Sequence, residues 1–228
     1  MKIILGIFFI IMTISLYALM KKVYVHFKYP ILVPIFTASF IAVCFLLTLK
    51  IPYTSYMYGG KWIDGLLGPA VVALAIPLYD HRKLIKSNVV NIFISVFIGS
   101  LIGVISGVIL SVIVGVNKEL LYSIAPKSVT TPIAMEISEL LGGTPAMAAV
   151  YVMVAGISGA VMGPFVLKTL KIKNSISKGI GFGTASHGIG TARALEMGSV
   201  EGAVSSIALT ISAIFTSVLC PVILSFIN

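Results

Sequence analysis

Residues 89–116 read VVNIFISVFIGSLIGVISGVILSVIVGV, a run of 28 residues without a charged side chain. A helix needs about 20 apolar residues to cross a bilayer, so this run is long enough to span one. Four more uncharged stretches have comparable length, at 3–20, 31–49, 144–167 and 202–227. A shorter stretch at 65–79 holds Pro69 and Pro77, which predicts a broken or shortened span. We therefore expect an all-α polytopic membrane protein with about six spanning helices.

The composition indicates the same class of protein. Of the 228 residues 58% are apolar and 10% are charged, and the mean hydropathy is +1.11. Soluble domains carry about a quarter charged residues, so this chain needs a lipid bilayer around it. The length accommodates one integral membrane domain over residues 1–228. The net charge of +9 comes from short basic clusters between apolar runs, so we expect no nucleic-acid partner.

The basic clusters also predict how the chain is oriented. Ten of the sixteen Lys and Arg residues lie in three linkers, at 21–28, 80–87 and 168–178. The positive-inside rule places these linkers in the cytoplasm, which puts both termini on the outer side of the membrane. If residues 179–200 instead form a complete broken span, the C-terminus lies inside.

Two segments are too polar to be ordinary spans. They read APKSVTTPIAMEISELLGG at 125–143 and GIGFGTASHGIGTARALEMGSV at 179–200, and both are rich in Gly, Ser and Thr and carry charges. Irregular backbone survives at membrane depth only where it is buried in protein or lines a wet cavity. With the orientation above, the first segment enters from outside and the second from inside. We therefore expect two re-entrant or broken helices in an inverted-repeat, transporter-like architecture.

The first segment has the features of an anion site. Pro132 suits the first position of a helix that Thr131 caps. Hydroxyls, unpaired backbone N–H groups and one ammonium then meet at a helix N-terminus, where the dipole favours negative charge. The candidate substrate-binding residues are Lys127, Ser128, Thr130, Thr131 and Pro132. The alternative is ordinary helix capping, with Lys127 reaching the surface.

Two carboxylates follow on the same helix. Glu136 and Glu139 are three residues apart and therefore share one face. Glu136 would be buried and would take up and release a coupled proton. The alternative is that this face is turned to extracytoplasmic water.

The second segment places polar side chains among glycines, at Thr184, Ser186, Gly188, Gly190 and Thr191. Glycine lets backbone amides turn toward a ligand without a side chain in the way, so we expect these residues to contact the substrate.

The same segment holds charged and titratable residues. Arg193 and Glu196 are three apart on a helix that we expect to begin near Thr191. They either pair with each other or leave Arg193 to hold a substrate carboxylate. His187 titrates near physiological pH and is a second candidate proton carrier, or else a structural histidine.

The residue pattern argues against catalysis. Ser186 and His187 are adjacent and so rarely face each other, and no third member of a triad is evident. His26 and His81 lie in other segments, without metal-ligand spacing to His187. We expect no enzymatic activity, no metal and no cofactor.

Glycines spaced by four residues mark two helix faces. One holds Gly99, Gly103 and Gly107, and the other holds Gly159 and Gly163. Small residues at this spacing let helix backbones approach closely in lipid, so we interpret both faces as packing surfaces.

The second half of the chain resembles the LrgB/CidB family. The resemblance rests on PKSVTTPIAMEISELLGG at 126–143, GISGAVMGP at 156–164 and GFGTASHGIGTARALEMG at 181–198. It implies a multi-pass protein of the bacterial inner membrane that works with a small LrgA/CidA-like membrane protein. Members are described as holin- or antiholin-like regulators of murein hydrolase activity and autolysis. Others resemble transporters of pyruvate, or of glycolate and glycerate in plastids.

Two functions are therefore expected from the sequence. The first is transport of a small organic anion, a monocarboxylate such as pyruvate, glycolate or lactate, coupled to protons. The resemblance places the substrate at 127–132 and 184–193. The second is modulation of murein hydrolase activity and autolysis through helix association, for which the glycine faces are suited. We also expect a homo-oligomer.

Overall fold

A computed structural model describes residues 2–27, 32, 34–66, 69, 72–73 and 75–226. Every regular element in these ranges is a helix. The chain divides into two compact units, an N-terminal unit of residues 1–74 and a C-terminal unit of residues 75–228, which are described separately.

The N-terminal unit contains α1 (Lys2–Phe27), α2 (Pro34–Thr48) and α3 (Tyr53–Asp64). Helices α1 and α3 cross where two glycines meet, because a Cβ added to Gly59 would lie 3.1 Å from the carbonyl carbon of Gly6. The hydroxyls of Thr13 and Tyr56 are 3.1 Å apart at the same interface. Small residues thus allow close packing, and one polar contact joins the two helices.

The C-terminal unit is built around three long helices, α7 (Val89–Val114), α10 (Pro145–Thr169) and α12 (Ser199–Ser225). Two short helices, α5 (Ala75–Asp80) and α6 (Arg82–Ser87), precede α7. The hydroxyls of Ser100 and Ser212 are 2.9 Å apart and join α7 to α12 in the core. The remaining elements are α8 (Lys118–Ile124), α9 (Thr131–Leu141) and α11 (Ser175–Met197).

Among the described residues, four helices are long and apolar enough to cross a membrane, namely α1, α7, α10 and α12. They confirm the prediction of an all-helical polytopic membrane protein. Helix α2 has 15 residues and is shorter than the predicted stretch 31–49, because it begins at Pro34. Proline has no N–H to donate and is favoured in the first turn. The predicted broken span at 65–79 falls partly outside the described residues.

Helices α8 and α9 form a hairpin. Helix α7 ends at Gly115, whose φ of 73° is left-handed, and the side chain of Asn117 then caps α8 by accepting from the Leu120 N–H at 2.9 Å. At the far end of α9, the backbone N–H of Thr144 donates to the Ser123 hydroxyl at 2.8 Å. The Thr144 hydroxyl also donates to the carboxylate of Glu119 near the start of α8, so the two ends of the hairpin are joined, and its tip is the loop 125–130.

Helix α11 is a second hairpin. Its backbone breaks at His187, where φ is 41° and ψ is −135°. A Cβ added to Gly190 would lie 2.6 Å from the carbonyl oxygen of Phe182, although the two residues are eight positions apart. In a continuous helix residues at that separation are about 12 Å apart, so the chain doubles back at His187.

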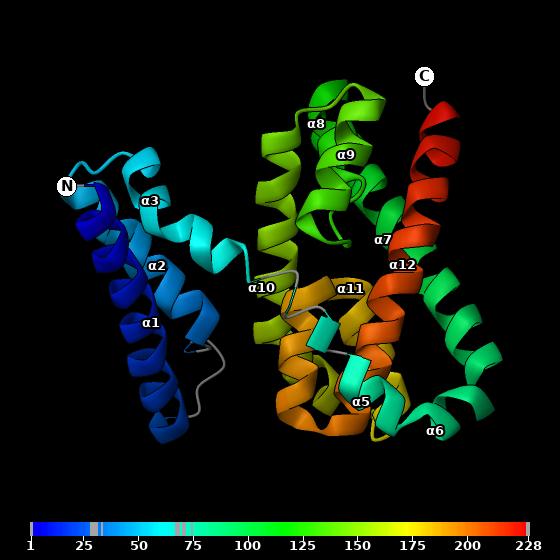
Figure 1. The fold of residues 1–228 in the computed structure, drawn as a ribbon. Coiled ribbons are helices and arrows are strands. Elements are labelled where there is room, and N and C mark those ends of the chain that lie inside the picture. The colour runs from blue at the N-terminus through cyan, green and yellow to red at the C-terminus, as the bar shows by residue number, and fades with distance from the viewer. Residues whose placement is uncertain are drawn as a thin grey trace. The chain divides into compact units, whose positions relative to one another are not determined.

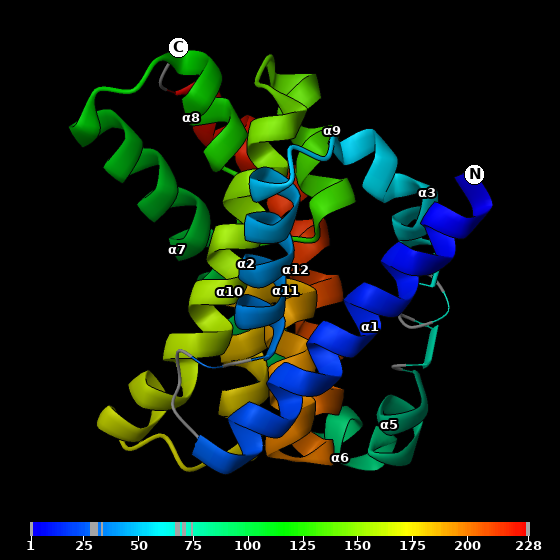
Figure 2. The same cartoon turned by 90° about the vertical axis from the view of Figure 1, so that its left-hand side faces the viewer.

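The two hairpins enter the C-terminal unit from opposite ends. We call one end the α6 end. There α11 starts and finishes beside the start of α12: the Lys178 ammonium lies 4.0 Å from the Glu201 carboxylate, and the His81 ring lies 3.0 Å from the Ser199 hydroxyl. At the α8 end, Leu121 of α8 packs with Leu224 of α12. Figure 1 and Figure 2 both show α8 and α9 beside the C-terminus and α6 at the opposite end.

Two local predictions need correction. Thr130, and not Thr131, is the N-cap of α9, so Thr131 is the first helical residue and Pro132 lies within the first turn. The Thr130 side chain makes no capping hydrogen bond. The helical arm that carries Arg193 begins directly after the break at His187, before Thr191.

Candidate functional site

The glycine face of α7 receives the tips of both hairpins. A Cβ added to Gly99 would lie 2.7 Å from Cγ2 of Thr184, and one added to Gly107 would lie 2.6 Å from Nζ of Lys127. The face is a packing surface, as the glycine spacing predicts. Its partners, however, are the polar hairpin tips and not another long helix.

Helix α10 holds α11 in the same way. A Cβ added to Gly163 would lie 2.6 Å from the Phe182 ring, and one added to Gly159 would overlap the Ser186 hydroxyl. One turn away, a Cβ on Gly156 would lie 2.6 Å from Nε2 of His187. Glycines on α10 therefore fix the position of the first arm of α11 up to its break.

A pocket of about 380 Å³ lies where the two tips meet α7 and α10. We call it the tip pocket. It joins the loop 125–130 to the first arm of α11, two segments that are far apart in the sequence. Its lining residues are Ser95, Gly99, Ile102, Gly103, Ser106, Lys127, Ser128, Ala155, Ile180, Gly181, Thr184 and Ala185.

Lys127 is the cation of the tip pocket. It is half-buried, and its Nζ donates a hydrogen bond of 2.6 Å to the carbonyl oxygen of Gly103. An ammonium has three N–H donors, so this contact orients the group and leaves it able to bind an anion. Ser128 lies beside it, where a Cβ on Gly103 would be 3.3 Å from the Ser128 hydroxyl.

Thr184 faces the same pocket from α11. It is 5% exposed, and its Oγ1 has no hydrogen-bond partner in the part of the chain that the structure describes. An unsatisfied buried hydroxyl costs about 1–3 kcal/mol, so its presence in a pocket wall is unusual. The pocket therefore holds the Lys127 ammonium and the buried Thr184 hydroxyl, which lacks a hydrogen-bond partner among the described residues.

Other predicted residues of the second segment stabilise the tip of α11. The Nε2–H of the buried His187 donates to the Val152 carbonyl at 2.9 Å. The Thr191 hydroxyl donates to the His187 carbonyl at 2.9 Å and lies 2.8 Å from the Ser205 hydroxyl. Ser186 packs on Gly159, as given above, and also on Gly190, where an added Cβ would lie 2.5 Å from Cβ of Ser186, and it does not line the tip pocket.

The remaining candidates lie outside the tip pocket. Arg193 forms an ion pair with Glu196, which is the alternative predicted from their spacing. Gly188 is exposed, and a Cβ added there would meet no atom within 4 Å. Thr130 and Thr131 lie at the start of α9 and are half-buried.

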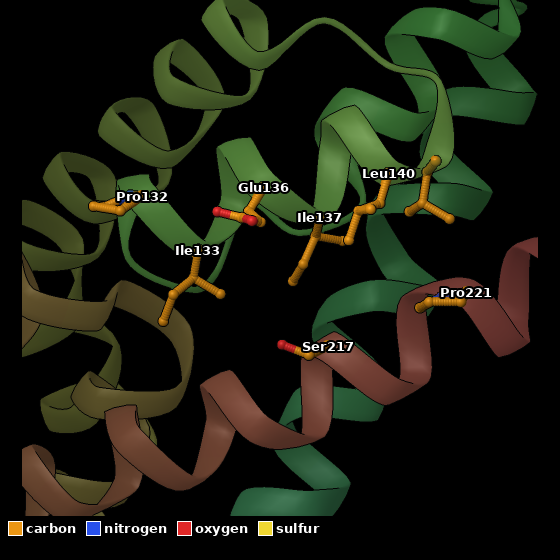
Figure 3. Close-up of a pocket in the computed structure, with 8 residues that line it drawn as sticks. Pro132, Ile133, Glu136, Ile137, Leu140, Ser217 and Pro221 are labelled. Atoms are coloured by element: carbon orange, nitrogen blue, oxygen red, sulfur yellow. The ribbon is translucent and has the colours of Figure 1, made fainter.

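A second pocket of about 380 Å³ lies between α9 and α12. Figure 3 shows Glu136 beside Ile133 and Ile137 on α9, with Ser217 and Pro221 across the pocket on α12. Glu136 is exposed there, whereas the functional interpretation of the sequence expected it to be buried. The core side of α9 is occupied by its buried residues Ala134, Ile137 and Ser138, which leaves Glu136 on the open side.

The sequence analysis missed Ser95 and Ser106, the two serines of α7 that line the tip pocket. They are eleven residues apart, which is three turns of a helix, and they flank Gly99 and Gly103 on one face. A small and polar face on an otherwise apolar spanning helix was therefore a readable signal. The glycine spacing alone had led us to interpret this face as a packing surface.

The long apolar helices and the two opposed hairpins define a multi-pass helical membrane protein whose C-terminal unit has a pocket where the hairpin tips meet. The chain belongs to the LrgB-like family, whose model matches residues 13–226.

Three relatives of the chain are bacterial proteins of nearly the same length. The chain is 43% identical over 219 residues to the protein YxaC of Bacillus subtilis, covering 96% of this chain and 95% of that one. It is 39% identical over 222 residues to YwbG of the same organism, covering 97% and 99% of the two chains. It is 36% identical over 215 residues to the holin-like protein CidB of Staphylococcus aureus, covering 94% of each. No solved structure matches the chain.

Proposed function

We propose that this protein carries a small monocarboxylate, of the size of pyruvate, glycolate or lactate, across the bacterial inner membrane. The observation that carries the proposal is the tip pocket, in which Lys127 and Ser128 of one hairpin lie with Thr184 of the other. The Lys127 ammonium would bind the carboxylate. The Thr184 hydroxyl would donate to a substrate oxygen and so gain the partner that it lacks in the protein.

The remaining lining of the tip pocket favours a small ligand with one negative charge. Lys127 is the one charged residue among the lining residues given above. Ile102, Ala155 and Ile180 supply an apolar wall, against which a second carboxylate would be costly to desolvate. A short acid with an oxo or hydroxyl group matches this combination of one cation, several hydroxyls and an apolar wall.

The order of elements supports a carrier with alternating access. Helix α7 runs toward the α8 end and is followed by the α8–α9 hairpin, whereas α10 runs back and is followed by the α11 hairpin. We interpret these as inverted repeats whose hairpins re-enter the membrane from opposite sides, within a protein of about six spans. The substrate site at the hairpin tips would then open to each side of the membrane in turn.

Coupling and partners belong to the same proposal. His187 and Glu136 stay the candidate proton carriers, His187 at the tip of α11 and Glu136 at the pocket between α9 and α12. We propose a homo-oligomer that works with a small LrgA/CidA-like membrane protein. No step of this scheme requires a cofactor or a chemical reaction on the substrate.

The second candidate function is modulation of a membrane lesion and of autolysis. It is favoured by the relative named holin-like protein CidB, at 36% identity. In that case the glycine faces would matter for helix association, and the residues of the tip pocket would not matter for autolysis. If autolysis instead follows carboxylate flux across variants, it is a consequence of transport.

The experiment is uptake of radiolabelled pyruvate into liposomes that hold the purified protein, with and without the small partner, across a pH gradient. Saturable uptake that Lys127→Ala abolishes supports the proposal. Lys118→Ala is the matched control, because it removes an exposed lysine from the same hairpin, and it should leave uptake unchanged. Absence of uptake for pyruvate, lactate and glycolate, with the partner present, contradicts transport, and a non-saturating leak favours a holin-like pore.

A further inference from the structure

Three glycines line the tip pocket, and two of them have a packing reason. A Cβ on Gly99 would lie 2.7 Å from Thr184, and a Cβ on Gly103 would lie 3.3 Å from Ser128. These two glycines let the hairpin tips approach α7. Gly181 differs, because a Cβ added there would meet no atom of the described residues within 4 Å.

Two nearby glycines of α11, Gly179 and Gly183, differ from Gly181 in that they have close packing contacts. A Cβ on Gly179 would lie 2.7 Å from the carbonyl oxygen of Glu201, and one on Gly183 would lie 2.8 Å from Cβ of Ala208. Both therefore pack tightly on α12. Gly181 is on the other side of the helix, exposed and in the wall of the tip pocket.

A glycine inside a helix lowers stability by about 0.5–1 kcal/mol relative to alanine. At Gly179 and Gly183 the close contact with α12 explains that loss. At Gly181 no contact with the described residues explains it, and a side chain there would take up free volume of the pocket.

We propose that Gly181 sets the size limit of the substrate, so that the bare helix backbone at this position admits acids that a side chain would exclude. The inference rests on the proposed transport function. Its direction follows from the open space: a methyl at 181 takes up volume next to Ile180 and Thr184, and a larger side chain takes up more. The bulkiest acids should be lost first and the smallest should be kept longest.

The test compares Gly181→Ala and Gly181→Val with the natural chain in liposomes. Unlabelled monocarboxylates of two to five carbons, ending with a branched 2-oxo acid, compete against labelled pyruvate. One methylene in a pocket changes binding by about 10–200-fold. Gly181→Val should therefore weaken competition by the branched five-carbon acid at least about tenfold more than competition by the two-carbon acid. Gly181→Ala should show a smaller shift of the same sign.

Ala192→Leu is the matched control for Gly181→Val. Each substitution adds three carbon atoms to an exposed position of α11, and Ala192 lines neither of the two pockets described above. The control should keep the natural order of competition.

The outcomes separate this inference from the function on which it rests. A natural order of competition in Gly181→Val, or an equal loss for all acids in Gly181→Ala, overturns the role of Gly181 and leaves transport standing. Absence of any carboxylate uptake by the natural chain overturns the transport proposal, and the size limit falls with it.

Discussion

The buried Thr184 hydroxyl is unfavourable for the stability of the protein but is proposed to bind the substrate. It has no partner in the described part of the chain, so removing it should not destabilise the protein. Thr184→Val, which keeps the shape, should lower the affinity for pyruvate about tenfold or more, because hydrogen bonds to charged groups are worth about 1.5–3 kcal/mol. The measurement is concentration-dependent uptake together with the melting temperature in detergent.

The control for this prediction is Thr210→Val. The Thr210 hydroxyl donates to the Ser206 carbonyl on an exposed part of α12, at 2.9 Å, and should not affect uptake. Normal uptake by Thr184→Val would show that the Thr184 hydroxyl does not bind the substrate. Loss of uptake with a lowered melting temperature would instead indicate a structural role.

His187 carries backbone strain that its contacts hold in place. Its φ of 41° and ψ of −135° lie in a region that glycine occupies far more readily than histidine. His187→Ala keeps the strain and loses the hydrogen bond to Val152, whereas His187→Gly loses the bond but relieves the strain. We therefore expect the glycine variant to melt at a higher temperature than the alanine variant. An equal or lower melting temperature would show that the position is not strained.

At the scale of elements, the position of α11 depends on close contact with the glycines of α10. A Cβ at Gly159 would overlap the Ser186 hydroxyl, so Gly159→Ala should push the hairpin away and destabilise the protein by about 1–3 kcal/mol. Thermal unfolding in detergent measures this. Adding Ser186→Gly should restore part of the loss, and the exposed Ser158→Ala on the same helix should have no effect. If the double variant is no better than Gly159→Ala alone, the overlap is not the cause.

The long helices were predictable because each contains a long uncharged run, and length and polarity alone decide whether a helix can span lipid. The two polar segments were predictable as exceptions for the same reason. The break at His187 was not predictable, because nothing in the local sequence Ser186-His187-Gly188 requires it. A positive φ would instead be expected at the neighbouring Gly188. Contacts from Val152, Thr191 and α10 fix the break at His187.

The candidate site was partly predictable. Lys127, Ser128 and Thr184 were identified from the local sequence of the two polar segments, and the structure brings them to one pocket. Arg193 and Thr191 share the same local pattern but turn toward Glu196 and Ser205. Which side of a doubled-back helix faces a pocket is decided by its packing on α10 and α12, and sequence spacing within α11 does not contain that information.

At the scale of the whole molecule, the charge distribution predicts how the C-terminal unit is oriented. In this unit the α6 end and the α10–α11 linker carry seven basic residues, whereas the connection from α7 to α8 carries one, Lys118 at the start of α8. The positive-inside rule then places the α6 end in the cytoplasm and the α8–α9 hairpin on the outer side. The seven residues are Arg82, Lys83, Lys86, Lys168, Lys171, Lys173 and Lys178.

Cysteine labelling tests this orientation in intact cells. In a chain whose Cys44 and Cys220 are replaced by alanine, a membrane-impermeant maleimide should label Lys118→Cys directly, because that position is exposed at the α8 end. It should label Lys173→Cys, exposed in the α10–α11 linker, only after the membrane is permeabilised. The reverse pattern would place the α11 hairpin on the outer side, and the Lys127 hairpin would then enter from the cytoplasm. Because the two hairpins lie at opposite ends, labelling of both positions in intact cells would mean that the chain inserts in both orientations.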